Sequence, residues 1–367
     1  MDIKVITRHV PSNYGSLLQS VATIRMIERL GHDCHIINYM RKDERGLKLI
    51  LTPLSQKSGW NNNLIKKLLY VLLRFPEEYH AQRKFDRMRG KFLKLTKRYS
   101  SSAELSTIEA DVFMTGSDQV WGPIVTEIYD KAYFLSFVSE NAKKVAYAAS
   151  FGRTHFNDRI LEEYKGMLSD YDAIAVRENT AVDLLTEMDV PCAGQVLDPT
   201  LLLTGDEWSE YIFENIAEKY VLVYQLHNNK QLDEYAKGFA ASVNLPLYRI
   251  SPTFHQLTRG GKFIYLPKLG EFLSYIKNCA YFITDSFHGT AFALNFNKEF
   301  IEILPNNKTG SRNQSILRLT GLEDRIVTDY NDFSISERAI DYRQVNFILK
   351  REREKSVDIL RSLCNRK

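Results

Sequence analysis

The sequence predicts an α/β protein with two Rossmann-like domains that face a cleft, and with a helical insertion in the first domain. Three observations support this fold class. Strand and helix patterns alternate along both halves of the 367-residue chain. The chain is longer than the roughly 250 to 300 residues at which one hydrophobic core stops growing. A short apolar strand leads directly into a helix at residues 279–294, as it does where open parallel sheets bind ligands.

The first fifty residues have the pattern of a β–α–β unit. Ile3-Lys-Val-Ile6 and His35-Ile-Ile-Asn-Tyr39 are predicted strands, and apolar residues recur between them at helical spacing until Gly31. Such a unit brings Ser16 to the amino end of a helix at the edge of a sheet, where an anion or a sugar binds readily. The alternative is that Gly15 is only a turn residue.

Two series of strands follow this unit. We assign residues 1–205 to the first domain and 206–335 to the second, and we expect residues 336–367 to form a helix that packs back across both. In the first domain the further strands are 110–114, 144–149 and 173–177. In the second domain the strands are 220–225, 247–250, 279–285 and 300–304, and the helical patterns between them are 230–243 and 270–278.

Residues 41–100 interrupt the first domain with a helical and strongly basic segment. They hold 16 Lys or Arg against 5 Asp or Glu, a net charge of +11, whereas the rest of the chain has 33 against 40, a net of −7. Residues 64–75 are basic and amphipathic. Two interpretations of this segment are open. In one, it contacts an anionic membrane face, a partner or a lipid-linked substrate. In the other, its apolar stripe packs on the sheet and its lysines are solvated.

Composition excludes several classes of protein. No run of about 18 apolar residues could cross a bilayer, and the amino terminus enters a strand without the pattern of an export signal. We therefore expect a cytoplasmic protein, at most peripheral at the inner face of the membrane. The chain carries none of the usual nucleic-acid motifs. Its oligomeric state is not defined by the sequence. Disulfides and a metal site are not expected, because the cysteines are far apart: Cys34, Cys192, Cys279 and Cys364.

His288 is the leading candidate for a catalytic side chain. It follows the predicted strand that ends at Asp285 and precedes a helix, so it would lie at the carboxyl end of the strand. Helix amide groups just beyond it could hold a phosphate or a carboxylate. The alternative is a histidine that only caps the helix or packs in the core.

Six segments, in this order and spacing, resemble the polysaccharide pyruvyl transferase family over about residues 3 to 325. They are Asn13-Tyr-Gly-Ser-Leu-Leu-Gln19, Gly116-Ser-Asp-Gln-Val-Trp121, Tyr147-Ala-Ala-Ser-Phe-Gly152, Val176-Arg-Glu178, Leu197-Asp-Pro-Thr-Leu201 and Thr284-Asp-Ser-Phe-His-Gly-Thr290. The resemblance implies a two-domain architecture like that of GT-B glycosyltransferases. It also implies transfer of the pyruvyl group of phosphoenolpyruvate to a pair of sugar hydroxyls as a cyclic ketal, with no cofactor.

The resemblance assigns roles to cationic residues. His288 would protonate the methylene carbon of the enol, and Arg177 and Arg312, with Lys308, would hold the carboxylate and phosphate of the donor. The alternatives are an ion pair of Arg177 with Glu178 or a contact at the domain interface, and a flexible basic loop around Lys308 and Arg312.

Other residues of the matching segments would contact the substrates. Asp118 and Gln119 would hydrogen-bond to sugar hydroxyls, and Trp121 would stack on a sugar ring unless it belongs to the core. Asp198 would more simply support a turn between the domains. The remaining expected contacts are Ser286, Asn13, Tyr14, Gly15, Ser16, Gln19, Ser117, Gly289 and Thr290.

One position departs from the family pattern. Many relatives carry an arginine beside a leucine–histidine pair, whereas this chain has Ser286-Phe-His288 without one. Either Arg177 and Arg312 replace that side chain, or the donor differs, or the activity is altered.

Two other functions therefore stay open. One is a glycosyltransferase that uses a nucleotide sugar, and the other is a non-catalytic sugar-binding or membrane-docking protein. An NAD dehydrogenase is disfavoured, because no G-x-G-x-x-G segment follows the first strand.

Overall fold

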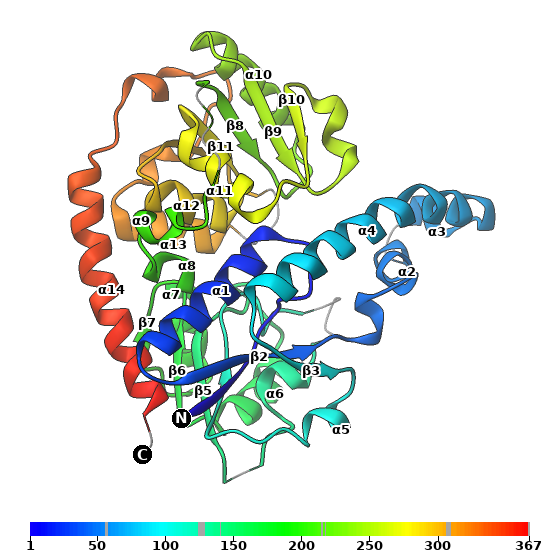
Figure 1. Ribbon diagram of the computed structural model, residues 1–367, viewed down its shortest axis with the longest axis vertical. Helices are drawn as coiled ribbons and strands as arrows, with labels where there is room; N and C mark the ends of the chain where they lie inside the picture. Colours follow the sequence, from blue (N-terminus) through cyan, green and yellow to red (C-terminus); the bar gives the residue numbers. More distant parts are fainter. Residues whose placement is uncertain are drawn as a thin grey trace.

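The computed structural model describes residues 1–55, 58–123, 129–139, 141–213, 216, 218–305 and 310–365. Two parallel sheets lie one above the other, each covered by helices, and both ends of the chain lie at the lower end of the molecule (Figure 1). The predicted α/β class with two Rossmann-like domains is confirmed. Lys308 lies outside the described residues.

The lower sheet belongs to the first domain. Within the described residues it has seven parallel strands in the order β3-β2-β1-β4-β5-β6-β7. The central strands are buried on both faces, which is why they are continuous apolar runs. The bounds are β1 Asp2–Ile6, β2 Asp33–Tyr39, β3 Leu95–Tyr99, β4 Val112–Thr115, β5 Lys143–Ala149, β6 Ala173–Val176 and β7 Gly194–Gln195.

Helix α1, Tyr14–Arg29, connects β1 to β2. Its amino end is capped by Asn13, whose side-chain oxygen accepts a hydrogen bond from Gly15 N at 2.7 Å. The chain leaves the helix through Gly31 at φ +84°, a conformation that glycine adopts readily. The other helices of this half are α5 Ser102–Leu105, α6 Asp158–Leu168, α7 Asn179–Glu187 and α8 Pro199–Leu202. The short helix α9, Gly205–Ser209, follows them and lies beside α12 of the upper half, where Trp208 packs on Phe292 (Figure 1).

The upper sheet belongs to the second domain. Its described strands are parallel and have the order β10-β9-β8-β11-β12. They are β8 Val221–Tyr224, β9 Leu247–Ser251, β10 Lys262–Tyr265, β11 Tyr281–Thr284 and β12 Glu299–Glu302. The helices are α10 Lys230–Ser242, α11 Leu269–Asn278, α12 Phe287–Asn295 and α13 Ser311–Thr320.

The insertion differs from the expectation in two ways. Its last part, β3, is an edge strand of the lower sheet and pairs with β2. Its helices are α2 Lys48–Ser55, α3 Ser58–Asn61 and α4 Leu64–Phe92. The apolar side of residues 64–73 is exposed. The alternative in which this stripe packs on the sheet is therefore wrong.

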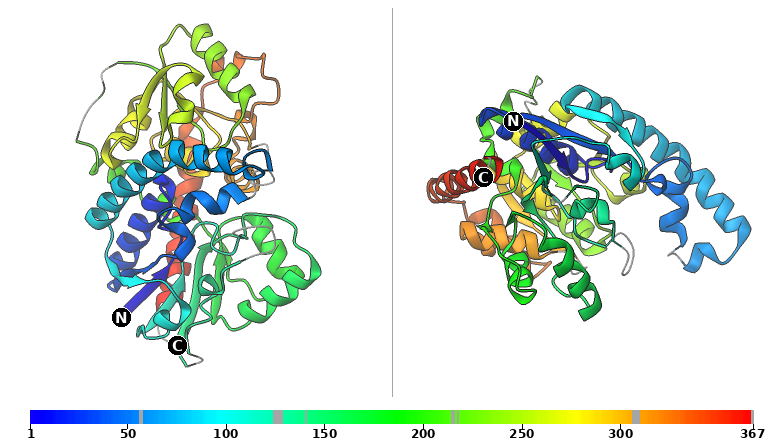
Figure 2. Two further views of the ribbon diagram at one scale, coloured as in Figure 1. Left: turned by 90° about the vertical axis from the view of Figure 1, so that its right-hand side faces the viewer. Right: turned by 90° about the horizontal axis from the view of Figure 1, so that it is seen from below.

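The two sheets share one hydrophobic core. A single cluster of buried residues includes Val5 below and Phe282 above. At the junction the ring of Tyr14 stacks on Phe272 with 4.2 Å between centroids, and its hydroxyl donates to Pro267 O at 2.5 Å. Helix α4 passes across the waist between the two halves (Figure 2). These contacts hold the domains together around the cleft.

The last helix, α14 Tyr342–Cys364, runs along one side of the molecule from the upper half to the lower half (Figure 1). Ser356 Oγ accepts a hydrogen bond from Leu197 N at 2.9 Å. Arg353 donates to Leu201 O and to Asn295 Oδ1, at 2.6 and 3.0 Å. The helix therefore ties the segment after β7 to α12 of the second domain.

Candidate active site

A cavity of about 450 Å³ lies between the two sheets, where several of their strands end. Ligands of open α/β sheets bind at this edge. The first domain contributes the loop after β1, the start of α1 and the loop after β4. The second contributes the loop after β8, the start of α12 and the start of α13. The lining residues are Arg8, Pro11, Asn13, Ser16, Asp118, Gln119, Leu226, His227, Asp285, Ser286, Phe287, His288 and Arg312.

His288 lies in the first turn of α12, on the wall of this cavity. Ser286 caps the helix by accepting from Gly289 N, which fixes the turn that carries the imidazole. The ring approaches α1 so closely that a Cβ on Gly15 would overlap it. Gly15 is thus required by a close approach of the two domains rather than by a turn.

His288 is 7% exposed, and its Nε2 lies 3.9 Å from Asp198 Oδ2. Among the described residues this Nε2 has no hydrogen-bond partner. Burial lowers the pKa of His288 below its ordinary value of 6.5, although Asp198 and Asp118 act in the opposite direction. The ring is therefore mostly neutral at pH 7.

Asp198 is the centre of a buried polar cluster. Its Oδ2 accepts from Ser117 Oγ at 2.5 Å and from Arg177 at 2.8 Å, and its Oδ1 accepts from Thr200 N at 3.0 Å as the cap of α8. Burial disfavours the carboxylate, but the cationic neighbours and the donors outweigh it and lower the pKa of Asp198 to about 2. Asp198 therefore stays ionised.

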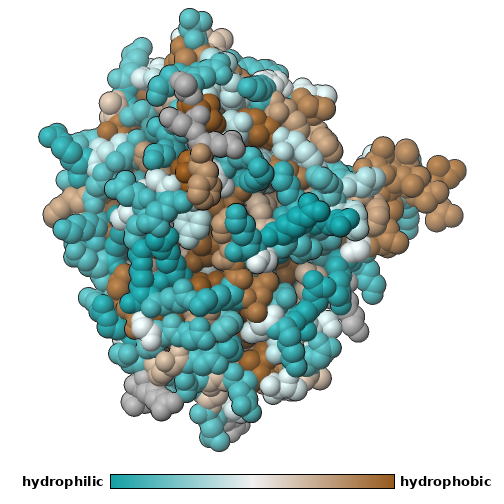
Figure 3. All heavy atoms as spheres, viewed as in Figure 1, coloured by the Kyte–Doolittle hydropathy of each residue, from teal (hydrophilic) through white to brown (hydrophobic). Residues whose placement is uncertain are grey.

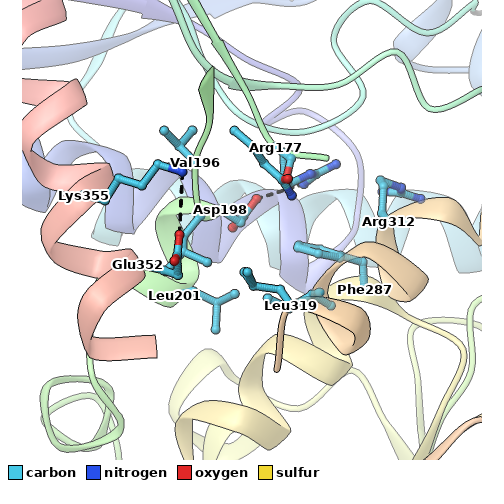
Figure 4. A pocket seen from close by; sticks show the side chains of 12 residues that line it. Arg177, Val196, Asp198, Leu201, Phe287, Arg312, Leu319, Glu352 and Lys355 are labelled. Atoms are coloured by element: carbon cyan, nitrogen blue, oxygen red, sulfur yellow. Dashed lines mark hydrogen bonds and ion pairs between the residues drawn. The ribbon is translucent and has the colours of Figure 1, made fainter. Parts of the chain in front are cut away.

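Arg177 lies in the wall behind the main cavity. It pairs with Asp198 and, at 3.5 Å, with Glu178, and its guanidinium lies 4.5 Å from the ring centroid of Phe287. It lines a second cavity of about 150 Å³ that reaches Glu352 and Lys355 of α14 (Figure 4). The pairing with Glu178 is thus present, and a role of Arg177 in holding the donor stays a prediction.

Arg312, at the start of α13, lines both cavities. With the Gln119 amide turned so that its oxygen faces the guanidinium, Gln119 accepts from Arg312 at 2.5 Å. Burial and the charge of Arg177 lower the pKa of Arg312 to about 10, so the side chain remains a cation at pH 7. Arg312 is placed to pair with an anion in the cleft.

Asp118 faces the cavity with an unusual backbone. Its φ is +80°, a left-handed value that costs energy in a residue with a side chain. Ser16 Oγ donates to its Oδ2 at 3.0 Å, and Gln119 N donates to its Oδ1 at 2.9 Å. Backbone strain of this kind is typical of functional sites. The two hydrogen bonds hold the Asp118 carboxylate at the cavity that His288 also lines.

Sequence reasoning missed two further side chains of the cavity, His227 and Arg8. His227 follows β8, and its Nδ1 lies 3.0 Å from Oδ2 of the buried Asp285, which also accepts from Leu226 N and His227 N. Arg8 follows β1 and has no hydrogen bond or ion pair within the described part of the chain. The rule that identified His288, a polar residue directly after a buried strand, would have found both.

Several residues that we expected to contact the substrates do not line the cavity. Trp121 is fully buried, donates to Tyr133 O and packs on Phe151, so the expectation that it stacks on a sugar is wrong. Gly15 admits the His288 ring. Five others have internal partners and lie in the core, which corrects their expected role: Tyr14, Gln19, Ser117, Gly289 and Thr290. The cavity does include Asn13, Ser16, Asp118, Gln119, Ser286, His288 and Arg312.

The fold and the cleft define a two-domain α/β protein with the GT-B architecture. The family model described as polysaccharide pyruvyl transferase matches residues 13–307. The chain therefore belongs to the polysaccharide pyruvyl transferase family, as its motifs indicated.

Solved structures agree on the fold. The S. aureus MnaA–UDP structure has a TM-score of 0.51 at 10% identity, over 97% of this chain and 91% of that chain. The spinosyn rhamnosyltransferase SpnG with thymidine diphosphate has a TM-score of 0.50 at 10% identity, over 100% of both chains. An α-glucosyltransferase with UDP-glucose and DNA has a TM-score of 0.50 at 11% identity, over 98% and 95%. No match was found among curated proteins.

Proposed function

We propose that the chain transfers the pyruvyl group of phosphoenolpyruvate to two hydroxyls of a saccharide and releases phosphate. The observation that carries this proposal is the cleft cavity, which is lined by His288 and Arg312 from one domain and by Arg8 from the other. Small dianionic or trianionic donors need such cations, and ketal chemistry needs a proton donor beside them. The family supports a pyruvyl group as the transferred unit.

The reaction balances with one proton donor and one acceptor. The methylene carbon takes a proton, and the first sugar hydroxyl forms a bond to the adjacent carbon while it loses its own proton. The second hydroxyl then forms a bond to the same carbon, the carbon–oxygen bond to phosphate breaks, and phosphate leaves with the remaining proton. Charge that develops on the phosphate is stabilised by groups already fixed in the cleft.

His288 is the proposed acid, and burial by the protein alone favours its neutral form. A donor that brings a carboxylate and a phosphate into the cavity favours the imidazolium form, because an adjacent negative charge raises the pKa of a histidine. Its Nε2, which has no partner among the described residues, is free to exchange a proton. His227, held by Asp285, is the second candidate for this role.

The arginine that many relatives carry is replaced here by an aromatic contact. Phe287 covers the guanidinium of Arg177 and lines the cavity. We assign the donor phosphate to Arg312 and Arg8 and to the amide groups that open α12 and α1. Lys308, expected to assist, remains a prediction.

The test measures phosphate release from phosphoenolpyruvate with a panel of saccharide acceptors. His288→Ala should lower the rate by about 100-fold or more, the usual size of acid–base catalysis. His32→Ala, in the turn at the other end of α1, is the matched control and should be active. Full activity of His288→Ala together with loss in His227→Ala would move the acid to His227.

The anion site is tested with a matched pair of arginines in one helix. Arg312→Gln should raise the KM for phosphoenolpyruvate by about tenfold or more, as expected when a charge-assisted contact is lost. Arg318→Gln removes an exposed arginine of α13 that pairs with Glu323 and should leave the KM unchanged. Equal effects of both variants would contradict the assignment of Arg312.

A glycosyltransferase remains the alternative, because the similar structures include complexes with UDP, UDP-glucose and thymidine diphosphate. Thermal unfolding distinguishes the donors, since a ligand that binds only the folded chain raises Tm. A rise with phosphoenolpyruvate and none with UDP or thymidine diphosphate supports the proposal. The reverse result supports the glycosyltransferase. A rise with sugars alone, and no turnover, would indicate a sugar-binding protein.

A further inference from the structure

The described residues between Leu47 and Phe75 form an arm that projects from the body of the molecule. It contains α2, α3 and the first half of α4, and it extends to the right of both domains (Figure 1). In the space-filling view the end of the arm is the most continuous apolar surface on that face (Figure 3). Nothing described in the chain covers it.

The exposed side of α4 in the arm is apolar. Six leucine and isoleucine side chains, spaced as pairs four residues apart, lie on one side of the helix. The residues on the other side, Lys67, Tyr70, Val71 and Arg74, are the half-buried ones. A surface helix normally buries its apolar side, and here the orientation is reversed. The exposed fractions are Leu64 82%, Ile65 76%, Leu68 60%, Leu69 47%, Leu72 62% and Leu73 64%.

The charge of the arm indicates what binds this stripe. From Arg45 to Pro76 the sequence has no Asp or Glu, so the lysines of the arm have no acidic neighbour in their own segment. Within the described residues, Lys48, Lys66 and Lys67 form no ion pair. Two copies of such an arm would repel each other, whereas an anionic surface would attract it. The cationic residues of this stretch are Arg45, Lys48, Lys57, Lys66, Lys67 and Arg74.

We propose that the arm docks the protein on the surface of an anionic lipid bilayer, with the apolar stripe of residues 64–73 at the level of the acyl chains. A helix with an apolar side and lysines beside it lies in the plane of such an interface. Among the described residues no helix has the length and apolarity that a membrane span needs, so the contact is peripheral.

The root of α4 connects this contact to the cleft. Glu77 accepts a hydrogen bond from Phe254 N of the second domain. Further along, Phe85 packs on Tyr14 with 5.0 Å between centroids, and Arg89 donates to Val10 O at 2.9 Å in the loop that lines the cavity. Docking would therefore fix how the cleft faces the bilayer. On the proposed function, this orientation suits a lipid-linked saccharide acceptor.

The experiment is co-sedimentation of the full chain with vesicles. We expect binding to phosphatidylcholine vesicles that contain about 30% phosphatidylglycerol, weaker binding to pure phosphatidylcholine, and a loss of binding as salt is raised. Leu68→Ser/Leu72→Ser should weaken binding at least about tenfold. Lys66→Ser/Lys67→Ser should weaken it about fivefold for each lysine, on the anionic vesicles only. Leu68, Leu72 and Lys66 are exposed and Lys67 is half-buried, and thermal unfolding verifies that the variants fold.

The control is Phe347→Ser, which removes another exposed apolar side chain, 64% exposed, from α14. It should bind vesicles like the natural chain. Absence of binding to anionic vesicles overturns the proposal, as does equal loss in Phe347→Ser. A dimer that is lost in Leu68→Ser/Leu72→Ser, without vesicle binding, would assign the stripe to self-association instead. Vesicle binding without phosphate release contradicts only the proposed function.

Discussion

Gly15 and His288 belong to different domains and meet in the cleft. A methyl group at position 15 would overlap the imidazole, so the His288 ring can take its place only beside a glycine. The strand-to-helix pattern predicted that His288 lies at a strand end, but it did not predict the contact with Gly15. The close approach also explains how the ring is buried while it lines a cavity.

Gly15→Ala should therefore displace His288 or the start of α1. We expect a loss of about 1–3 kcal/mol in the free energy of unfolding, as for other overpacked sites, together with slower phosphate release. Denaturant unfolding measures the first effect. Gly166→Ala, where a Cβ meets nothing within 4 Å, should instead stabilise α6 by about 0.5–1 kcal/mol. Unchanged stability and activity in Gly15→Ala would contradict the contact.

At the scale of elements, Glu302 joins β12 to the starts of α12 and α13. It is fully buried, lies 2.5 Å from Thr290 Oγ1 and accepts from Asn313 Nδ2 at 2.6 Å. Thr290 Oγ1 also lies 3.1 Å from Ser286 O, and its one hydrogen cannot serve both contacts. Burial raises the pKa of Glu302 to about 8, so the carboxyl is protonated at pH 7 and donates to Thr290.

This proton makes stability depend on pH. Between pH 6.5 and 8 the unfolded chain has released the proton and the folded chain retains it, so stability falls by about 2 kcal/mol as pH rises. Glu302→Gln, which keeps the shape and a donor, should remove this decline. Denaturant unfolding across that range measures it, with the exposed Glu337→Gln as control. The same slope in Glu302→Gln and in the natural chain would exclude Glu302 as its source.

Helix α4 shows what periodicity can and cannot predict about an element. The pattern of residues 64–75 predicts an amphipathic helix, and α4 is one, but periodicity does not say what its apolar side faces. Edge strands were missed for a related reason. Leu95-Thr-Lys-Arg-Tyr99 has two charged residues, which an edge strand tolerates and a central strand does not.

At the scale of the whole molecule, the two domains share one core, and we expect them to unfold as one cooperative unit. Tyr14 is the central contact, since it stacks on Phe272, packs on Phe85 and donates to Pro267 O. Tyr14→Ala should cost about 3–5 kcal/mol and separate the unfolding of the two domains. Calorimetry would then show two transitions, where the natural chain shows one.

Tyr14→Phe is the control for this prediction. It keeps the stacked ring and leaves Pro267 O without its donor, so it should cost about 1–3 kcal/mol and retain a single transition. Two transitions in the natural chain would show that the shared core does not couple the domains. A single transition in Tyr14→Ala would place the coupling elsewhere, for example in α14.

The sequence by itself determined the α/β class, the family and the strand-end position of His288, because strands, helices and motifs depend on residues that are neighbours along the chain. The same motifs contain Asn13, Ser16, Asp118 and Gln119, and the family resemblance of residues 308–313 added Arg312; all five line the cleft cavity. Only the tertiary structure decided that Trp121 is core, that Arg177 lies behind Asp198, and that His227 and Arg8 join the site. These outcomes depend on which segments, far apart in the sequence, pack against each other when two sheets share one core. The local sequence pattern does not determine that packing.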